Sequence, residues 1–201
     1  MITIELLYQQ SHCTNFKYFY INYLQLYSTE FPVILSYNRF IELKRRMLVY
    51  LNLLIGWYCD NAQDTGVSYI DSTSIAVCHP KKINRNQVFS GLAKLGKSTK
   101  GWFYGFKLHL VINSCGEITG VSLTAGNADD RSVVDSVTKH ITGLLFGDKG
   151  YIKQELFDQL YSRGLKFITG IRKGMKNKLM SLFEKVLLRK RSILLRLCLV
   201  Y

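Results

Sequence analysis

The stretch that decides the fold is "VSYIDSTSIAV", residues 67 to 77, a β-branched and apolar run that contains Asp71. Its alternating side chains predict a β-strand. A second strand is predicted at 102–113, "WFYGFKLHLVIN", and the turn "SCGE" leads into a third, "ITGVSLTAG", at 118–126. Three successive strands joined by short connections indicate an antiparallel meander.

After the meander, helical and strand patterns alternate along the chain. The successive segments are a helix in 128–141 ("ADDRSVVDSVTKHI"), a short buried strand in 144–151 ("LLFGDKGY"), a helix in 152–164 ("IKQELFDQLYSRG") that Gly164 caps, a strand in 165–172 ("LKFITGIR") and the beginning of a last helix in 179–193. The order predicts an α/β fold, a mixed sheet of a three-strand antiparallel meander plus two parallel strands, flanked by helices.

The first 65 residues have a different pattern. Aromatic and aliphatic side chains recur there at helical spacing, as in Phe16, Tyr20 and Tyr23, and predict two or three packed helices. The polar stretch "DNAQDTG", residues 60–66, is the best boundary. We therefore expect an amino-terminal helical segment at 1–65, an α/β domain at 66–193 and an apolar tail at 194–201.

The charge of the chain points to a polyanionic partner. There are 27 Lys and Arg against 14 Asp and Glu, a net charge of +13, and no acid between Asp71 and Glu117. Such a balance favours nucleic acid, with an anionic membrane surface as the weaker alternative. The longest apolar stretch, at 47–59, contains Asn52 and is too short to span a bilayer. We therefore expect a protein that binds nucleic acid and does not enter a membrane.

Two acidic residues lie in or directly after apolar strands, where aspartate is unusual. Asp71 lies inside an apolar strand, and Asp148 follows the strand "LLF". In the predicted order these two strands are adjacent, so both carboxylates would converge at one edge of the sheet. Paired carboxylates next to basic segments suit divalent-metal phosphoryl transfer. The alternative for each aspartate taken singly is a turn cap.

Several motifs then resemble a known family. "IDSTSI", "GWFYGFKLHLVIN", "GNADDR", "LFGDKGYI" and "IRKGMKNKLM…LLRKRS" resemble bacterial insertion-sequence transposases of the DDE superfamily, with the nine-eight-two group most similar. The resemblance implies an RNase H-like fold and cleavage and joining of double-stranded DNA, at the element ends and the target. It also implies two Mg²⁺ ions on an Asp, Asp, Glu triad, with Asp71 and Asp148 as the first two acids. A protein of this kind would be cytoplasmic and associated with the bacterial nucleoid.

The basic residues that flank this centre are the expected DNA contacts. Their simpler interpretation is a solvated face, but two acid-poor blocks on either side of one site favour phosphate binding. "GLAKLGKS" at 91–98 matches a phosphate-loop pattern, yet a strand follows it, so we interpret it as a basic loop that touches DNA. The predicted DNA-binding residues are Lys81, Lys82, Arg85, Lys94, Lys97, Lys100, Lys149, Arg172, Lys173, Lys176, Arg189 and Arg191.

The third acid of the triad is missing from its expected place. Relatives read approximately R-x-x-x-E in the last helix, so Arg191 matches the arginine, and Leu195 stands where the glutamate belongs. Ile-Glu-Thr-Val can be encoded as ATT GAG ACT GTG T, and reading from the second base gives Leu-Arg-Leu-Cys, the residues at 195–198. A frameshift near residue 193 is the interpretation we favour. A native apolar tail helix is the alternative.

The amino-terminal region also differs from that of the relatives, which carry several dozen residues before the segment matching ours. We therefore expect a transposase piece shortened at both ends and catalytically incomplete. The competing hypothesis is a non-catalytic DNA-binding remnant that forms homo-oligomers or pairs with, and interferes with, full-length transposase. A host RNase H-like nuclease fits the fold but not the series of motifs.

Overall fold

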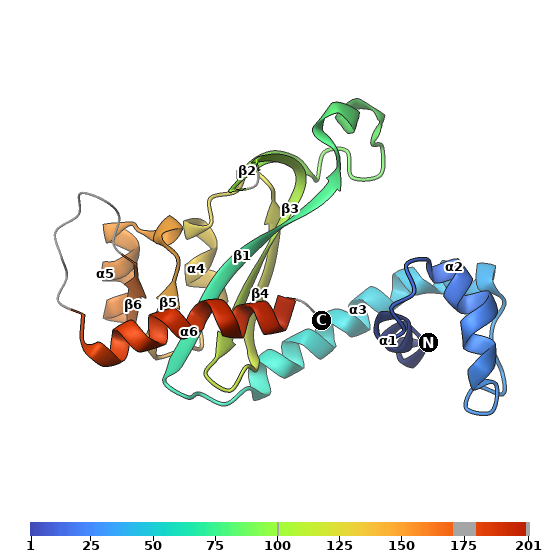
Figure 1. Cartoon of the computed structure of the whole chain (residues 1–201), viewed down its shortest axis with the longest axis horizontal. Helices are drawn as coiled ribbons and strands as arrows, with labels where there is room; N and C mark the ends of the chain where they lie inside the picture. The colour runs from blue at the N-terminus through green and yellow to red at the C-terminus, as the bar shows by residue number, and fades with distance from the viewer. Residues whose placement is uncertain (100, 171–179, 200–201) are drawn as a thin grey trace. The chain divides into compact units, whose positions relative to one another are not determined.

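We analysed a computed structural model of the chain, which describes residues 1–99, 101–170 and 180–199, without the side chains of residues 192–199. The chain forms two compact units, Met1–Trp57 and Tyr58–Tyr201 (Figure 1). Across the described residues, none of the helices combines the length and the apolar character that a bilayer crossing requires.

The first unit is a cluster of short helices around an aromatic core. It contains α1 (Ile2–Gln10), α2 (Phe16–Tyr18), the π-helical turn η1 (Phe19–Tyr23), the 3₁₀ turn η2 (Leu24–Tyr27) and most of α3 (Tyr37–Asn61). Phe19, Leu24 and Phe40 are fully buried. The ring of Phe16 contacts the rings of Tyr8 and Phe40 at centroid distances of 5.0 and 5.5 Å. The predicted aromatic stripes are therefore the core of this unit.

The second unit carries the sheet and the candidate site. Its elements are β1 (Val67–Cys78), η3 (Pro80–Arg85), β2 (Lys94–Ser98), β3 (Gly101–Asn113), β4 (Ile118–Ala125), α4 (Arg131–Val137), β5 (Gly143–Gly147), η4 (Lys149–Tyr151), α5 (Gln154–Ser162), β6 (Leu165–Thr169) and α6 (Leu182–Leu199). The strand order is β2-β3-β1-β5-β6, and β4 pairs with β3. β1, β3 and β4 are antiparallel, whereas β5 and β6 add in parallel to β1.

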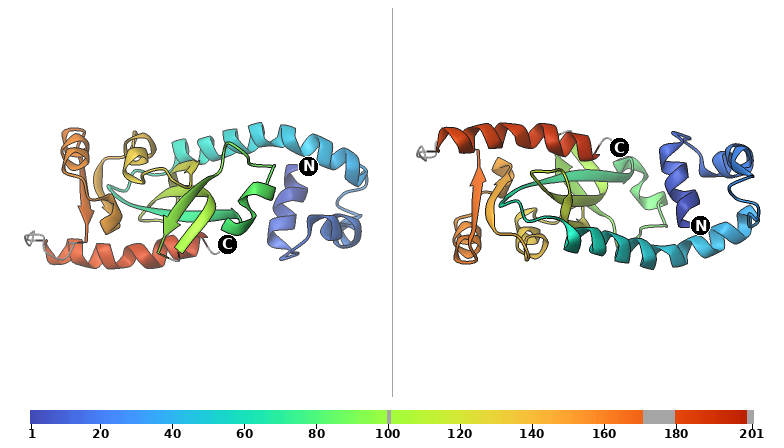
Figure 2. Two further views of the ribbon diagram at one scale, coloured as in Figure 1. Left: turned by 90° about the horizontal axis from the view of Figure 1, so that it is seen from above. Right: turned by 90° about the horizontal axis from the view of Figure 1, so that it is seen from below.

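Alternate residues of the central strands point to opposite faces of the sheet, and each face has its own helices. On one face, Ile70 and Leu145 pack with residues of α4 and α5, including Val134 and Leu160. On the other face, Tyr69, Leu110, Ile112, Phe146 and Ile168 pack against Leu187 and Leu188 of α6. The ribbon views agree, with α6 on one side of the sheet and α4 and α5 on the other (Figure 2). The central part of the sheet, where β1, β5 and β6 pair, is thus covered on both faces.

The observed architecture confirms the predicted mixed α/β sheet flanked by helices, with one strand more than expected. "KLGKS" was predicted as part of a basic loop, but it forms β2 and pairs with Gly101–Gly105 of β3. Gly164 adopts a φ of 81° and its N–H donates to the carbonyl of Tyr161 at the end of α5, as expected for a helix-ending glycine. The helix α6 runs through 194–199, the residues predicted as an apolar tail.

Candidate active site

The two aspartates lie at the same level of neighbouring strands. β1 and β5 are parallel, with Tyr69 opposite Phe146, and Asp71 and Asp148 each follow two residues later. Asp71 is still inside β1, whereas Asp148 comes directly after β5. The pairing of the first and fourth predicted strands therefore places both aspartates just beyond the point where the β1–β5 pairing ends.

The surroundings of the two carboxylates differ. Asp71 is partly buried, and this burial raises the pKa of its carboxyl above the ordinary value. The charge of Arg191 and a 2.9 Å hydrogen bond from the Ser72 N–H oppose that rise, while the nearby charge of Asp148 adds to it. The Asp148 side chain is 57% exposed and accepts no capping hydrogen bond at the start of η4. A turn cap therefore does not explain Asp148.

One face of α6 packs on the sheet beside the two aspartates. Glu184, Leu187, Leu188 and Arg191 follow the i, i+3, i+4, i+7 spacing of one helix face. The two leucines pack on the sheet, and Nη2 of Arg191 lies 3.6 Å from Oδ1 of Asp148. The sequence assigned Arg191 to DNA binding, and the structure places its guanidinium against the acidic pair. Helical spacing from the two leucines is the sequence signal that could have located it.

Glu184, at the amino-terminal end of this face, forms hydrogen bonds with the residue that directly precedes the helix. Its Oε2 accepts the Ser181 N–H at 2.9 Å, and its own N–H donates to Oγ of Ser181 at 3.1 Å. This reciprocal pair is a capping box. Its Oε1 also accepts from Nζ of Lys166 at 2.6 Å. Glu184, the only acid of α6, therefore caps the helix and does not serve as the third acid.

We expect Glu184→Gln to lower the free energy of unfolding by roughly 0.5–1 kcal/mol at neutral pH, because glutamine keeps the cap but loses the pairing with Lys166. Hydrogen bonds from Lys166 and Ser181 lower the pKa of Glu184 below its ordinary value of 4.5. Its stabilising charge is therefore present above that value and lost as the pH falls through the lowered pKa. Urea unfolding at several pH values should show the difference at about pH 7 and its disappearance in acid.

The matched control for that measurement is Glu155→Gln. Glu155 also pairs with a lysine, Lys153, at 2.7 Å, but its side chain is 81% exposed. The control should lose much less unfolding free energy at pH 7, because an ion pair between exposed side chains contributes little. A Glu184→Gln deficit that persisted at acid pH would mean that packing, and not charge, sets the effect.

A second acid near Asp71 is committed to structural contacts. Asp130 accepts from Nζ of Lys107 at 2.8 Å and from Oγ of Ser72 at 3.0 Å. Lys107 also donates to the carbonyl of Ala128 at 2.8 Å. Asp129 pairs with Arg131, with 2.6 Å between Oδ2 and Nη2. Asp130 therefore ties the segment before α4 to the sheet, and each of the two acids is paired with a basic side chain.

The side chains present do not fit a two-ion metal centre. Two carboxylates supply hard oxygen ligands, and the Arg191 guanidinium lies beside them, with a buried Nη1 that has no hydrogen-bond partner among the described residues. Mg²⁺ prefers six oxygen ligands and repels a neighbouring cation. Throughout the described part of the chain, no group of three or more His, Cys, Asp or Glu is placed to hold a metal. The two aspartates by themselves therefore supply too few ligands for a two-ion centre, and Arg191 lies beside them within 3.6 Å of Asp148.

The predicted DNA-binding residues fall into three groups. Lys81, Lys82 and Arg85 lie exposed in η3, and Lys94 and Lys97 lie exposed in β2. Both sets lie at one end of the β1–β3 ladder, the end that projects beyond the rest of the sheet (Figure 1). Lys149 directly follows Asp148 in η4, Arg191 of α6 lies against Asp148, and Arg189 is exposed on another side of α6. Lys100, Arg172, Lys173 and Lys176 lie outside the described residues.

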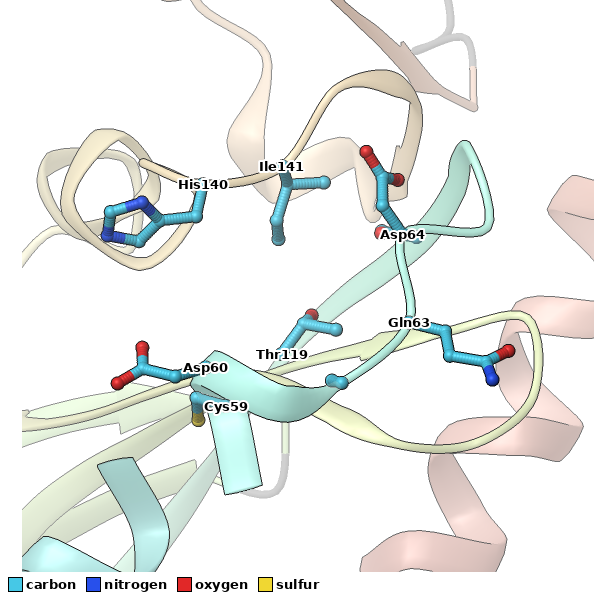
Figure 3. Close-up of a pocket in the computed structure, with 9 residues that line it drawn as sticks. Cys59, Asp60, Gln63, Asp64, Thr119, His140 and Ile141 are labelled. Carbon is cyan, nitrogen blue, oxygen red and sulfur yellow. The ribbon is translucent and has the colours of Figure 1, made fainter. Parts of the chain in front are cut away.

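A small pocket lies at the opposite end of β5. It has a volume of about 210 Å³, and Cys59, Asp60, Asp64, His140 and Ile141 contribute to its lining. Figure 3 shows Asp60 and His140 on two sides of it. Asp64 already accepts hydrogen bonds from the Gly66 N–H and the Thr142 hydroxyl. The pocket is smaller than most ligand sites, and the acidic pair is the better candidate site.

Comparison with known families identifies the domain. Residues 61–198 match the sequence profile described as "Transposase DDE domain". The chain belongs to this family. Transposase DDE domains are generally metal-dependent, and the matched region contains both Asp71 and Asp148. The match continues through position 195, where this chain carries leucine.

Two solved structures are similar to the chain at low identity. The first is piggyBac transposase in a synaptic complex with hairpin DNA, with 12% identity, a TM-score of 0.47, and coverage of 67% of this chain and 30% of that one. The second is a simian T-cell lymphotropic virus intasome in complex with a PP2A regulatory subunit, with 17% identity, a TM-score of 0.32, and coverage of 65% and 42%. The chain thus spans less than half of either. No curated protein matches it.

Proposed function

We propose that this DDE-domain chain binds double-stranded DNA at the element ends and the target, with Asp71 and Asp148 as the first two acids of a centre for strand cleavage and transfer. The family match and the level placement of the two carboxylates on neighbouring strands support this assignment. A bacterial insertion sequence of the nine-eight-two group is the source that the sequence motifs favour. The protein would then act at the nucleoid.

The second part of the proposal is that this chain cleaves DNA poorly, and it rests on which residues form the centre. Position 195 is leucine, Glu184 caps α6, and Arg191 contacts Asp148. Mg²⁺ is the ion we propose for an intact centre of this family, held by two aspartates and a glutamate. In the present chain the centre has two carboxylates and a guanidinium, so we propose that cleavage of DNA stays near background.

The basic arm, formed by η3 and β2 at the projecting end of the β1–β3 ladder, supplies a way to hold DNA without cleaving it. β1 rises about 3.3 Å per residue, so the eight residues from Asp71 to His79 place η3 roughly 26 Å from the acidic pair. That distance corresponds to about eight base pairs of duplex DNA. Lys81 and Lys82 would contact phosphates there, while Lys149, which follows Asp148, would do so beside the acidic pair. DNA would then follow the β1–β3 ladder.

A salt titration of duplex binding by fluorescence anisotropy tests this surface. Loss of two phosphate contacts in Lys81→Gln/Lys82→Gln should reduce the slope of log K against log salt by about 1.8, since each contact contributes roughly 0.9. Lys139→Gln/Lys153→Gln removes the same charge elsewhere on the unit and should leave the slope nearer to that of the parent. Equal slopes for the two double variants would contradict a DNA-binding arm.

Catalysis is tested separately with the same purified chain. With Mg²⁺ and supercoiled DNA, the parent chain should nick the DNA no faster than the Asp71→Asn variant does. Robust Mg²⁺-dependent nicking by the parent, lost in Asp71→Asn, would show that the chain is a complete enzyme.

A second candidate function takes up the Arg191–Asp148 contact, which offsets one of the two negative charges of the acidic pair. A DNA-binding remnant of this kind would interfere with an intact transposase by occupying its DNA or by pairing with it, and would form homo-oligomers by the same surface. Sedimentation with and without DNA would distinguish the two routes: pairing predicts a dimer without DNA, and competition predicts a monomer.

A further inference from the structure

The helix α3 is apolar on two sides, and one of them lies outside the core of the first unit. Phe40 and Met47 are buried in the aromatic cluster. Val49, Leu53 and Trp57 recur every four residues on a different side of the helix and are 62%, 66% and 58% exposed. The packing of the unit therefore explains the first side of α3 and leaves the second side without an explanation.

Further residues extend this second side in both directions. We call the whole surface the α3 seam, and it consists of Arg46, Val49, Tyr50, Leu53, Gly56, Trp57 and Asp60. Neighbouring members recur at the short intervals that are typical of a helix that pairs with another helix. Arg46 and Asp60 are exposed at its two ends, and no charged residue lies between them. The seam is thus an apolar surface with one positive and one negative end.

The seam is complementary to a second copy of itself. In an antiparallel pair that crosses at Leu53, residues at equal distances before and after Leu53 face each other. Val49 of one copy then faces the partner's Trp57, and Arg46 faces the partner's Asp60. Both contacts occur twice, because such a pair has a two-fold axis. The order of residues along the seam therefore gives apolar contacts around the centre and an ion pair at each end.

Gly56 fits the same arrangement. Glycine inside a helix is destabilising compared with alanine, and a Cβ added at Gly56 would meet nothing within 4 Å. The fold of the single chain therefore does not require glycine there. In the antiparallel pair Gly56 faces the partner's Tyr50, and the missing side chain leaves room for the ring. Because the distance between packed helices depends on the side chains at the contact, this glycine permits a close crossing.

We propose that the α3 seam is a self-association surface, on which a second copy of this chain docks its own α3 antiparallel across Leu53. The occupant is a second copy because the seam matches itself in charge, with Arg46 against Asp60 at each end and an uncharged stretch between them in both copies. DNA would require basic charge along the seam. The inference supplies the surface that pairing requires in the second candidate function, and it depends neither on DNA binding nor on the acidic pair.

Sedimentation equilibrium of the full chain without DNA tests the proposal through a pair of charge reversals. Arg46→Glu and Asp60→Arg each place like charges at both ends of the paired seam, so the dimer of either variant should dissociate at least about tenfold more readily than that of the parent. An equimolar mixture of the two has opposite charges at both ends again and should associate about as tightly as the parent. Arg45→Glu, the same charge change at the exposed neighbouring position, should dimerise as the parent does.

Leu53→Glu tests the centre of the seam, because two glutamates would meet at the two-fold axis. It should be monomeric at concentrations where the parent is a dimer. Circular dichroism and thermal melting establish that the variants are folded. If Leu53→Glu does not fold, the two charge-reversed variants, which change only exposed positions, decide the question.

A folded Leu53→Glu chain that still dimerises, or a mixture that associates no more tightly than its separate components, overturns the proposal. A parent chain that stays monomeric also overturns it, and binding of that monomer to anionic lipid vesicles, lost in Leu53→Glu, would then assign the seam to a membrane surface. Because no DNA is present, a failure of the proposed DNA-binding function would leave these results unaffected.

Discussion

Leu195→Glu is expected to raise Mg²⁺-dependent nicking of supercoiled DNA by roughly 100-fold, which corresponds to about 2.7 kcal/mol of transition-state stabilisation. Position 195 lies one turn after Arg191 in α6, so the new carboxylate would continue the helix face that covers the acidic pair. A third hard ligand completes the donor set that divalent phosphoryl transfer requires. At i+4 it would also compete with Asp148 for the Arg191 guanidinium.

The specificity of this gain can be tested on the same helix. Leu194→Glu adds an identical charge about 100° further around the helix, and should leave nicking at the parent's level. Adding Asp71→Asn to Leu195→Glu should abolish the gain, because the site then has one fewer charged ligand. Nicking that rose equally in Leu194→Glu, or that failed to rise in a folded Leu195→Glu protein, would show that position 195 does not belong to the centre.

The sheet could be predicted largely because its central strands have buried, apolar segments. Apolar and β-branched runs at β1, β3, β5 and β6 follow directly from that burial. β2 could not be predicted, since "KLGKS" has two lysines, a glycine and little β propensity. It is a strand because its backbone pairs with the start of β3, with Lys97 opposite Trp102. Here long-range pairing overrides local preference.

The candidate site was easier to predict in its strand residues than in its helix residue. Asp71 and Asp148 could be identified because an aspartate in or after an apolar strand is unusual, and strand order then brings them together. Arg191 gives no such signal, since it belongs to a run of basic residues in which Arg189 and Lys190 are exposed. Only the packing of Leu187 and Leu188 determines which of the three reaches the acidic pair.

Gly105→Ala is expected to cost about 3 kcal/mol or more, lowering the melting temperature of the second unit by roughly 6–12 °C. Gly105 pairs with Ala76 of β1 and Lys94 of β2, and its carbonyl accepts the Gly126 N–H at 2.9 Å. A Cβ at this position would overlap the carbonyl oxygen of Ile75. Because the obstacle is backbone and not a flexible side chain, the strands themselves must move apart.

Gly150→Ala is the matched control for that effect. A Cβ at Gly150 meets nothing within 4 Å, and its backbone does not require glycine. It should melt within about 1 °C of the parent, or slightly above it, because alanine reduces the entropy of the unfolded chain. Thermal melting by circular dichroism would compare the two. If Gly105→Ala melted together with Gly150→Ala, β1 and β3 would not approach each other closely at Ile75. A large loss confined to Gly105→Ala would mean that the ladder carrying the basic arm is part of the cooperative unit that holds Asp71.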